Sequence, residues 1–201
     1  APMRGQVMET ARGERREVVL ADGSVVQIDP ESRLRVRFGE NTRRVVLDAG
    51  RALFRLTKNP ARPFLVEADS TTVRAVGTAF GVERKETGVV VTVSEGKVAI
   101  EKRGTAQAAR FLTANEQVTV VSSSSAAPVR KVDSARVLAW AEGRLNFENT
   151  PIREVVAQFN RYNTIQLRVE DEELASRPIS GVFNAANPQG FIDFVEATTV
   201  V

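Results

Sequence analysis

Residues 33–38 read Arg33-Leu34-Arg35-Val36-Arg37-Phe38, and they indicate the fold of the first half of the chain. Three apolar side chains alternate with three arginines at a period of two, which predicts a strand with one buried face. Residues 52–56 and 64–68 alternate in the same way, and the apolar run Val89 to Val93 predicts a central strand buried on both faces. The pattern predicts an all-β domain of many short antiparallel strands, in a sandwich or solenoid-like form.

Turn residues separate these strands. Asp22-Gly23 lies between two valine-rich runs, where it predicts a two-residue hairpin that needs positive φ. Glu95-Gly96 precedes Lys97-Val98-Ala99-Ile100 and predicts a similar hairpin. No helical pattern is found between Gln6 and Val121.

The composition changes near residue 130. Residues 122–128 are rich in Ser and Ala, as a linker would be, and helical spacing begins after them. The net charge is +7 over residues 1–131 (22 basic, 15 acidic) and −4 over residues 132–201 (6 basic, 10 acidic). We therefore expect an all-β domain at 1–130 and a second domain at 131–201.

The second domain contains an internal repeat. Ser134 is expected to cap a short helix that ends at Gly143. Each repeat then has a strand, an Asn or Thr cap with Pro at the first helical position, and an amphipathic helix. The expected elements are strands at 145–147, 165–169 and 179–183, and helices that begin at Pro151 and Pro188. This predicts a small α/β domain of repeated βαβ units, in which the last strand is truncated at Val201 or is supplied by another chain.

The composition argues against most catalytic chemistry. The 201 residues include no Cys and no His, which removes thiol nucleophiles, the usual general base and the commonest metal ligands. We expect no catalytic residue, cofactor or metal. The net charge is only +3, and the arginines are dispersed through strands, so nucleic-acid binding is not predicted. The longest charge-free stretch, Pro178 to Ile192, is too short to cross a membrane.

Acidic residues offer the remaining sites for chemistry. Asp171-Glu172-Glu173 has the composition of a cation site but not the spacing of one, so a solvated loop between the βαβ units is the preferred interpretation. Asp22 and Glu95 could act as a pair of glycosidase carboxylates, but each precedes a glycine in an expected turn and serves that turn instead.

Ordered motifs across nearly the whole chain resemble the periplasmic part of FecR-type anti-sigma regulators. Each motif alone is a turn or a strand, and the order of about nine of them makes the match specific. The β part carries Gly13-Glu14, residues 20–25, 63–66, 76–82, 93–98 and Ala114-Asn115-Glu116. The second part carries residues 140–147, Pro151-Ile152, Phe159-Asn160-Arg161-Tyr162 and residues 179–183. One departure lies in Ala114-Asn115-Glu116, where the family usually has Gly before the Glu and this chain has Asn115; only a changed turn is expected.

The resemblance implies a regulator without catalytic activity. Such proteins are anchored in the inner membrane by one helix and control an extracytoplasmic-function sigma factor through a cytoplasmic segment; both parts would precede Ala1. Their periplasmic part receives a signal from the small signalling domain of a TonB-dependent outer-membrane transducer, usually a receptor for a siderophore or ferric chelate. The repeat at 145–201 looks like a copy of that signalling domain, which is an STN-like fold also found in secretins.

The resemblance and the exposed strand edges together suggest where a partner binds. We expect strand addition to an incomplete sheet within residues 140–201, with the β domain as a spacer toward the membrane. The candidate contact residues, most of which should also be core, are Trp140, Leu145, Phe147, Tyr162, Ile165, Leu167, Val182 and Phe183. The alternatives are an extracellular β-domain that binds carbohydrate or a surface polymer, a two-carboxylate enzyme, and a secretin-like or receptor module. The only Trp and the only Tyr lie outside the β part, which disfavours a carbohydrate platform there.

Overall fold

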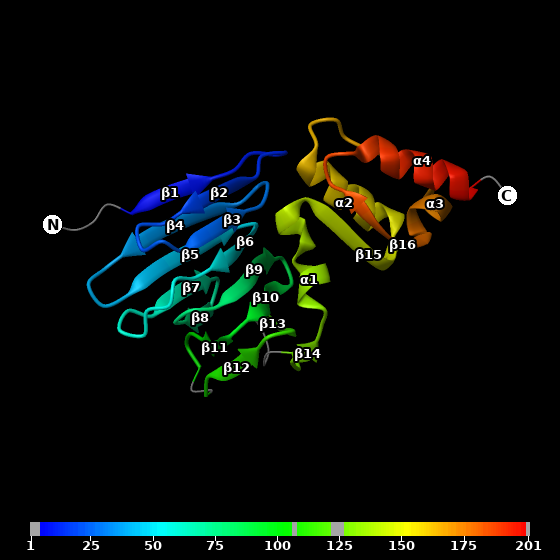
Figure 1. Ribbon diagram of the computed structural model, residues 1–201. Coiled ribbons are helices and arrows are strands. Elements are labelled where there is room, and N and C mark those ends of the chain that lie inside the picture. Colours follow the sequence, from blue (N-terminus) through cyan, green and yellow to red (C-terminus); the bar gives the residue numbers. More distant parts are fainter. Residues whose placement is uncertain (1–4, 106–107, 122–126, 200–201) are drawn as a thin grey trace.

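The computed structural model describes residues 5–105, 108–121 and 127–199. These residues form a sandwich of two seven-stranded sheets, followed by a two-stranded sheet with helices (Figure 1). The expected linker at 122–128 lies mostly outside the described residues. No helix in the described part is long and apolar enough to span a bilayer.

The first sheet of the sandwich has the strand order β1-β4-β5-β7-β8-β11-β12. All its neighbours are antiparallel except β5 and β7, which are parallel. Its strands are β1 (Gln6–Glu9), β4 (Arg33–Phe38), β5 (Arg43–Ala49), β7 (Phe64–Ala68), β8 (Thr71–Ala75), β11 (Lys97–Lys102) and β12 (Arg110–Thr113).

The second sheet has the order β14-β13-β10-β9-β6-β3-β2, and all of its neighbours are antiparallel. Its strands are β2 (Arg16–Val19), β3 (Val25–Ile28), β6 (Arg51–Arg55), β9 (Ala79–Lys85), β10 (Gly88–Glu95), β13 (Glu116–Val120) and β14 (Arg130–Lys131). The predicted central strand lies within β10, which pairs with β9 and β13; Val90 is half-buried and its neighbours are buried.

The chain crosses repeatedly between the two sheets, which corrects one expected hairpin. β10 and β11 lie in different sheets and do not pair, so Glu95-Gly96 is a corner between the layers. Gly96 has φ 79°, and Gly50, at the corresponding corner between β5 and β6, has φ 76°. A Cβ at Gly50 would lie 2.7 Å from the Glu31 carbonyl oxygen. A corner and a hairpin both need positive φ, so the residue pattern does not distinguish them.

The other expected hairpin forms with a longer loop. β2 and β3 pair, and the Leu20 N–H donates to the Ser24 carbonyl at 2.8 Å. The loop therefore contains three residues, Ala21, Asp22 and Gly23, and the third has φ 81°. A three-residue loop with a left-handed last residue is a common alternative to the two-residue turn.

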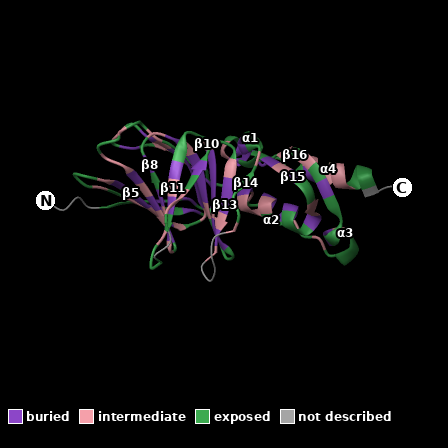
Figure 2. Cartoon of the chain, turned by 90° about the horizontal axis from the view of Figure 1, so that it is seen from below, coloured by how far each residue is buried: buried purple, intermediate pink, exposed green. Residues whose placement is uncertain are grey.

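Apolar side chains from both sheets meet in one core. Buried residues accordingly lie along the strands of the sandwich (Figure 2). Phe54 of the second sheet lies 6.0 Å from Phe64 of the first and 5.4 Å from Phe80, measured between ring centroids. Leu34 is buried, whereas Val36 and Phe38 are half-buried and pack on the core, so the expected inward face of β4 is confirmed.

A second core belongs mainly to the α/β unit, which we define as residues 144–199. Its strands β15 (Arg144–Pro151) and β16 (Pro178–Asn184) form the two-stranded sheet. Its helices are α2 (Ile152–Tyr162), α3 (Glu172–Ser176) and α4 (Pro188–Thr199). The expected apolar face of α2 is confirmed, because Ile152, Val155, Val156, Phe159 and Tyr162 are all buried.

The expected strand at Ile165–Val169 is absent, so only part of the βαβ repeat forms. The side chain of Asn160 explains the difference. Its amide donates to the Leu167 carbonyl at 2.9 Å and accepts from the Leu167 N–H at 2.8 Å. The α2 side chain thus satisfies the backbone groups that a neighbouring strand would otherwise bind.

Helix caps agree with the prediction only in part. Asn187 caps α4 by accepting from the Gly190 N–H at 3.0 Å, as expected. Pro151 is itself the cap residue of α2, without a side-chain bond. Asp171 caps α3 by accepting from the Leu174 N–H, so residues 171–173 begin a helix and are not a loop.

A short connector joins the sandwich to the α/β unit. It consists of α1 (Ser134–Val137) and the 3₁₀ helix η1 (Ala139–Glu142), and it ends at Gly143 with φ 80°. Asp133, not Ser134, caps α1, while Ser134 bonds to Asn115. Leu138 packs against Gly81 of β9, and Leu53 of β6 belongs to the core of the α/β unit, so the connector covers part of the second sheet.

Candidate partner-binding site

The two-stranded sheet leaves β15 with one strand neighbour among the described residues. The Ala185 N–H donates to the Gly143 carbonyl at 2.9 Å, and the register continues from this pair through Arg144↔Asn184 to Phe147↔Gly181. Hydrogen-bonded and non-hydrogen-bonded pairs alternate in an antiparallel ladder. Arg144 and Asn146 therefore turn their backbone N–H and C=O groups away from β16, toward the outer edge of β15.

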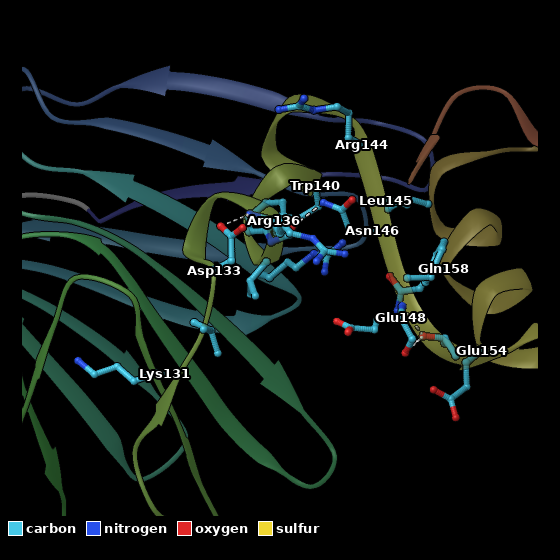
Figure 3. A pocket seen from close by; sticks show the side chains of 15 residues that line it. Lys131, Asp133, Arg136, Trp140, Arg144, Leu145, Asn146, Glu148, Glu154 and Gln158 are labelled. Atoms are coloured by element: carbon cyan, nitrogen blue, oxygen red, sulfur yellow. Dashed lines mark hydrogen bonds between the residues drawn. The ribbon is translucent and has the colours of Figure 1, made fainter. Parts of the chain in front are cut away.

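A groove of about 630 Å³ lies along this edge (Figure 3). One wall comes from the segment that leads from β14 into α1, including Lys131 and Asp133. The other wall is β15 with the exposed start of α2, including Glu154. Arg51 of β6 and Trp140 of η1 also line the groove, so residues from the sandwich and from the α/β unit both contribute to it.

The groove carries charges of both signs. Its lining includes four basic and three acidic residues. Three of the basic side chains are already paired with acidic residues outside the lining, as Arg51–Asp29, Lys131–Glu116 and Arg144–Glu142. The fourth is Arg136, and the acidic residues are Asp133, Glu148 and Glu154. A groove of mixed charge beside an open strand edge suits an extended polypeptide better than a uniformly charged polymer.

Three of the predicted contact residues line the groove, namely Trp140, Leu145 and Phe147. They are only 7%, 4% and 7% exposed, so their side chains belong mainly to the core. These residues can contact an occupant of the groove only through the backbone edge of β15 and through the small accessible portions of their side chains.

The other predicted residues are spread over the α/β unit. Val182 is 61% exposed and pairs with Asn146 across the sheet, while Phe183 is half-buried against other aromatic rings. Ile165 is 74% exposed in the segment after α2. Leu167 lines a second, largely apolar hollow of about 480 Å³ between α2 and α4. The structure therefore does not bring all eight residues to one surface.

Tyr162 belongs to a buried polar cluster that sequence reasoning missed. Its hydroxyl donates to the carboxylate of Asp29, with oxygen distances of 2.7 and 2.9 Å, and accepts from Arg51 Nη2 at 2.7 Å. Arg51 Nε donates to Asp29 Oδ2 at 2.5 Å. We call these three residues the Asp29 cluster. It joins the end of α2 to β6 and to the residue after β3.

Facing groups offset the cost of burial in this cluster. Burial is the largest single effect on Arg51 and would lower its pKa, but the facing Asp29 carboxylate together with Tyr162 and Glu83 outweighs it and holds the pKa well above its ordinary value. Burial raises the pKa of the Tyr162 hydroxyl, which therefore stays protonated as a donor. The guanidinium of Arg51 also lies 4.5 Å from the ring centroid of Trp140, so the cluster reaches the groove.

The sequence gives only a weak signal for this cluster. Asp29 and Arg51 are single charges next to apolar strand residues, which suggests a buried or capping role. Their partner Tyr162 is separated from them by 133 and 111 positions, so no local pattern could connect the three.

Asp22 and Glu172, two of the acidic residues considered as sites for chemistry, have structural partners. The Asp22 carboxylate accepts from the Ser24 N–H and hydroxyl and from Arg43. Burial works to raise the pKa of Asp22, but these bonds outweigh it, so the pKa lies below its ordinary value. Glu172 pairs with Arg153. Within the residues that the structure describes, no three acidic side chains gather as a metal site would require.

Comparisons with known proteins agree on the fold. Residues 6–99, from β1 into β11, match the family model described as FecR protein. Two crystal structures described as a "putative anti-sigma factor" from Parabacteroides distasonis ATCC 8503 superpose on this chain, each with a TM-score of 0.80. They are 24% and 25% identical in sequence and cover 96% and 98% of this chain, which in turn covers 92% of each of them. No curated protein matches.

Proposed function

We propose that this chain is the periplasmic sensing part of an inner-membrane anti-sigma regulator. It receives a signal from the periplasmic signalling domain of a TonB-dependent outer-membrane transducer and controls an extracytoplasmic-function sigma factor. The FecR match over residues 6–99 and the anti-sigma description of the superposing structures support the regulatory role. The sigma factor would bind a cytoplasmic segment that precedes Ala1 and is joined to it by a membrane helix.

The open edge of β15 is the observation that carries the partner-binding role. Unpaired backbone groups at a strand edge offer a template for an added strand, and the groove beside this edge leaves room for one. We assign partner binding to residues 131–201, an STN-like unit, and the spacer role to the β domain at 1–130. Trp140, Leu145 and Phe147 border the edge and form its apolar support.

A proline scan of the two sheet edges tests this role. Proline has no N–H and places its ring at the strand edge, so it blocks strand addition where the N–H points outward. Asn146 and Val182 are paired across the sheet, so Asn146→Pro blocks the edge of β15 and Val182→Pro blocks the opposite edge. Binding of the periplasmic signalling domain of a TonB-dependent transducer from the same organism is measured by titration calorimetry.

We expect Asn146→Pro to weaken binding at least tenfold and Val182→Pro to leave it within twofold. Asn146→Ala is the matched control, because it removes the side-chain bond to the Arg136 carbonyl but keeps the backbone N–H. Loss of binding in Val182→Pro alone would move the site to the edge of β16. Equal binding by all three variants would reject strand addition to this sheet.

A further inference from the structure

The two walls of the groove belong to parts of the molecule that the Asp29 cluster holds together. Lys131 is the last residue of β14 in the sandwich, whereas Glu154 and Gln158 lie on α2. Tyr162 is the last residue of the same helix and is fixed to Asp29 and Arg51. A helix of 11 residues is rigid over this length, so the bond at its end determines where its groove wall lies.

We propose that the Asp29 cluster is a lock that sets the width of the groove, and that Asp29 and Tyr162 act as positioning residues for the incoming strand. The proposal rests on the proposed function for the identity of the occupant. Neither Asp29 nor Tyr162 lines the groove, so their effect on binding passes through the placement of its walls. A groove whose width is already set binds a strand without the cost of ordering its walls.

Arg51 connects the lock to the groove. It bonds to both other members of the cluster, it lies over Trp140, and it lines the groove itself. An occupant that shifts Trp140 must therefore disturb the stacked guanidinium, and a change in the cluster must disturb Trp140. Binding and lock geometry are coupled in both directions.

Neighbouring bonds support the same junction. Arg161 Nη2 donates to the Pro30 carbonyl at 3.0 Å, and the Gly13 N–H donates to the Arg161 carbonyl at 2.9 Å. The Nη2 atom of Arg161 also lies 3.6 Å from Asp29 Oδ2. The end of α2 is thus attached to the loops on both sides of β2 and β3, and Asp29, with a fully buried side chain, is at the centre of these contacts.

The test compares two aspartates that each bind an arginine. Asp29→Asn weakens the lock, whereas Asp48→Asn weakens the Arg35–Asp48 pair between β4 and β5 of the first sheet, and neither of these two side chains bonds to a described residue of the α/β unit. Tyr162→Phe removes the bridging hydroxyl and leaves Asp29 paired with Arg51. Val66→Ala in the sandwich core supplies a variant that loses stability without altering the junction.

Two measurements test the lock without depending on binding of the signalling domain. Trp140 is the only Trp, so its fluorescence reports the Arg51 contact directly. The chain has no Cys, so cysteines introduced at the exposed positions Glu101 and Ala157 carry spin labels that measure the separation of sandwich and α2. Affinity for the transducer signalling domain is measured on the same variants of the whole 201-residue chain.

We expect Asp29→Asn and Tyr162→Phe to shift the Trp140 emission, broaden the spin-label distances and weaken signalling-domain binding at least fivefold. Asp48→Asn and Val66→Ala should match the wild type in Trp140 emission, in spin-label distances and in affinity for the signalling domain. Wild-type affinity in a variant with broadened distances would overturn the coupling, and unchanged distances in both lock variants would overturn the lock. If the wild-type chain does not bind the signalling domain, the proposed function fails, while the distance measurement still decides the lock.

Discussion

Two buried arginine–aspartate pairs lie near opposite ends of the sandwich and serve different purposes. Arg43 begins β5 and binds Asp22 in the β2–β3 loop, whereas Arg51 begins β6 and binds Asp29 after β3. β5 has seven residues, so it separates the two sites by about 20 Å. In both pairs the shortest contact is 2.5 Å, and each guanidinium lies over an aromatic ring, Phe64 or Trp140.

The partners of the two arginines differ in their distance along the chain. Arg43 donates to the carbonyls of Thr57 and Arg62, so all its polar partners lie within the sandwich. Arg51 also binds Tyr162, which belongs to the α/β unit. A buried arginine–aspartate pair thus holds elements of the sandwich together at one end and joins the sandwich to the α/β unit at the other. We expect the first pair to govern stability and the second to govern communication between units.

Arg43→Met should cause the largest loss of stability. It leaves the Asp22 carboxylate, whose side chain is 10% exposed, without its fully buried cation, and breaking a buried pair in this way costs about 3–5 kcal/mol. Urea unfolding followed by circular dichroism measures the loss. Arg35→Met is the control, because the Arg35–Asp48 pair is partly exposed and should cost less than about 1 kcal/mol. Equal losses would show that burial of Arg43 does not matter.

Tyr162→Phe should reduce the free energy of unfolding by about 1.5–3 kcal/mol, since hydrogen bonds to charged groups are lost in a buried site. Ser94→Ala, which removes a neutral bond to the Ala79 carbonyl, should cost less. Unfolding is followed through Trp140 fluorescence. A Tyr162→Phe variant as stable as the wild type would mean that solvent replaces the hydroxyl and that the junction is open.

Gly81→Ala tests the apolar part of the same junction. An added Cβ would lie 2.5 Å from Leu138 Cδ2, so the leucine must shift. We expect a loss of about 1 kcal/mol, at the lower limit for overpacking because a leucine methyl can move. Gly39→Ala is the control, since a Cβ there meets nothing closer than 3.8 Å. Differential scanning calorimetry compares the two, and equal midpoints would argue against close packing at Gly81.

The smallest expected effect concerns Glu116 of β13, which binds Lys131 of β14. The Lys131 ammonium and the Thr113 N–H lower the pKa of Glu116 to about 2, from an ordinary value of 4.5. A lowered carboxyl pKa stabilises the fold above pH 4.5, and the stabilisation is lost as the pH falls from 4.5 to 2. The difference in thermal midpoint between wild type and Glu116→Gln should therefore shrink over this range. A difference independent of pH would contradict the assignment.

Much of the secondary structure could be predicted from local pattern. The alternation in Leu34, Val36 and Phe38 identified the inward face of β4, and the spacing from Ile152 to Tyr162 identified the buried face of α2. The prediction failed where one signal allows two structures. Gly96 permits either a hairpin or a crossing between sheets, and residues 165–169 alternate like a strand although Asn160 binds their backbone.

The candidate site, too, could be predicted from the sequence only in part. Trp140, Leu145 and Phe147 could be chosen from sequence because apolar residues of a short strand and a lone Trp mark an element that packs on one side. Ile165 and Leu167 were grouped with them, but the structure places Leu167 in a different hollow. Which edge of the two-stranded sheet borders a groove depends on how the connector folds over β6 and β9, and no local pattern records that.

The sequence alone determined the periodicity of strands and helices, the positions of most turns and the lack of Cys and His. These properties depend on neighbours within a few residues, whose spacing fixes which side chains share a face. Only the tertiary structure decided that Asp29, Arg51 and Tyr162 meet, and that Arg51 also lines the groove. Local spacing cannot record this meeting, because Tyr162 lies 111 and 133 positions from Arg51 and Asp29 and reaches them only where the end of α2 packs against the sandwich.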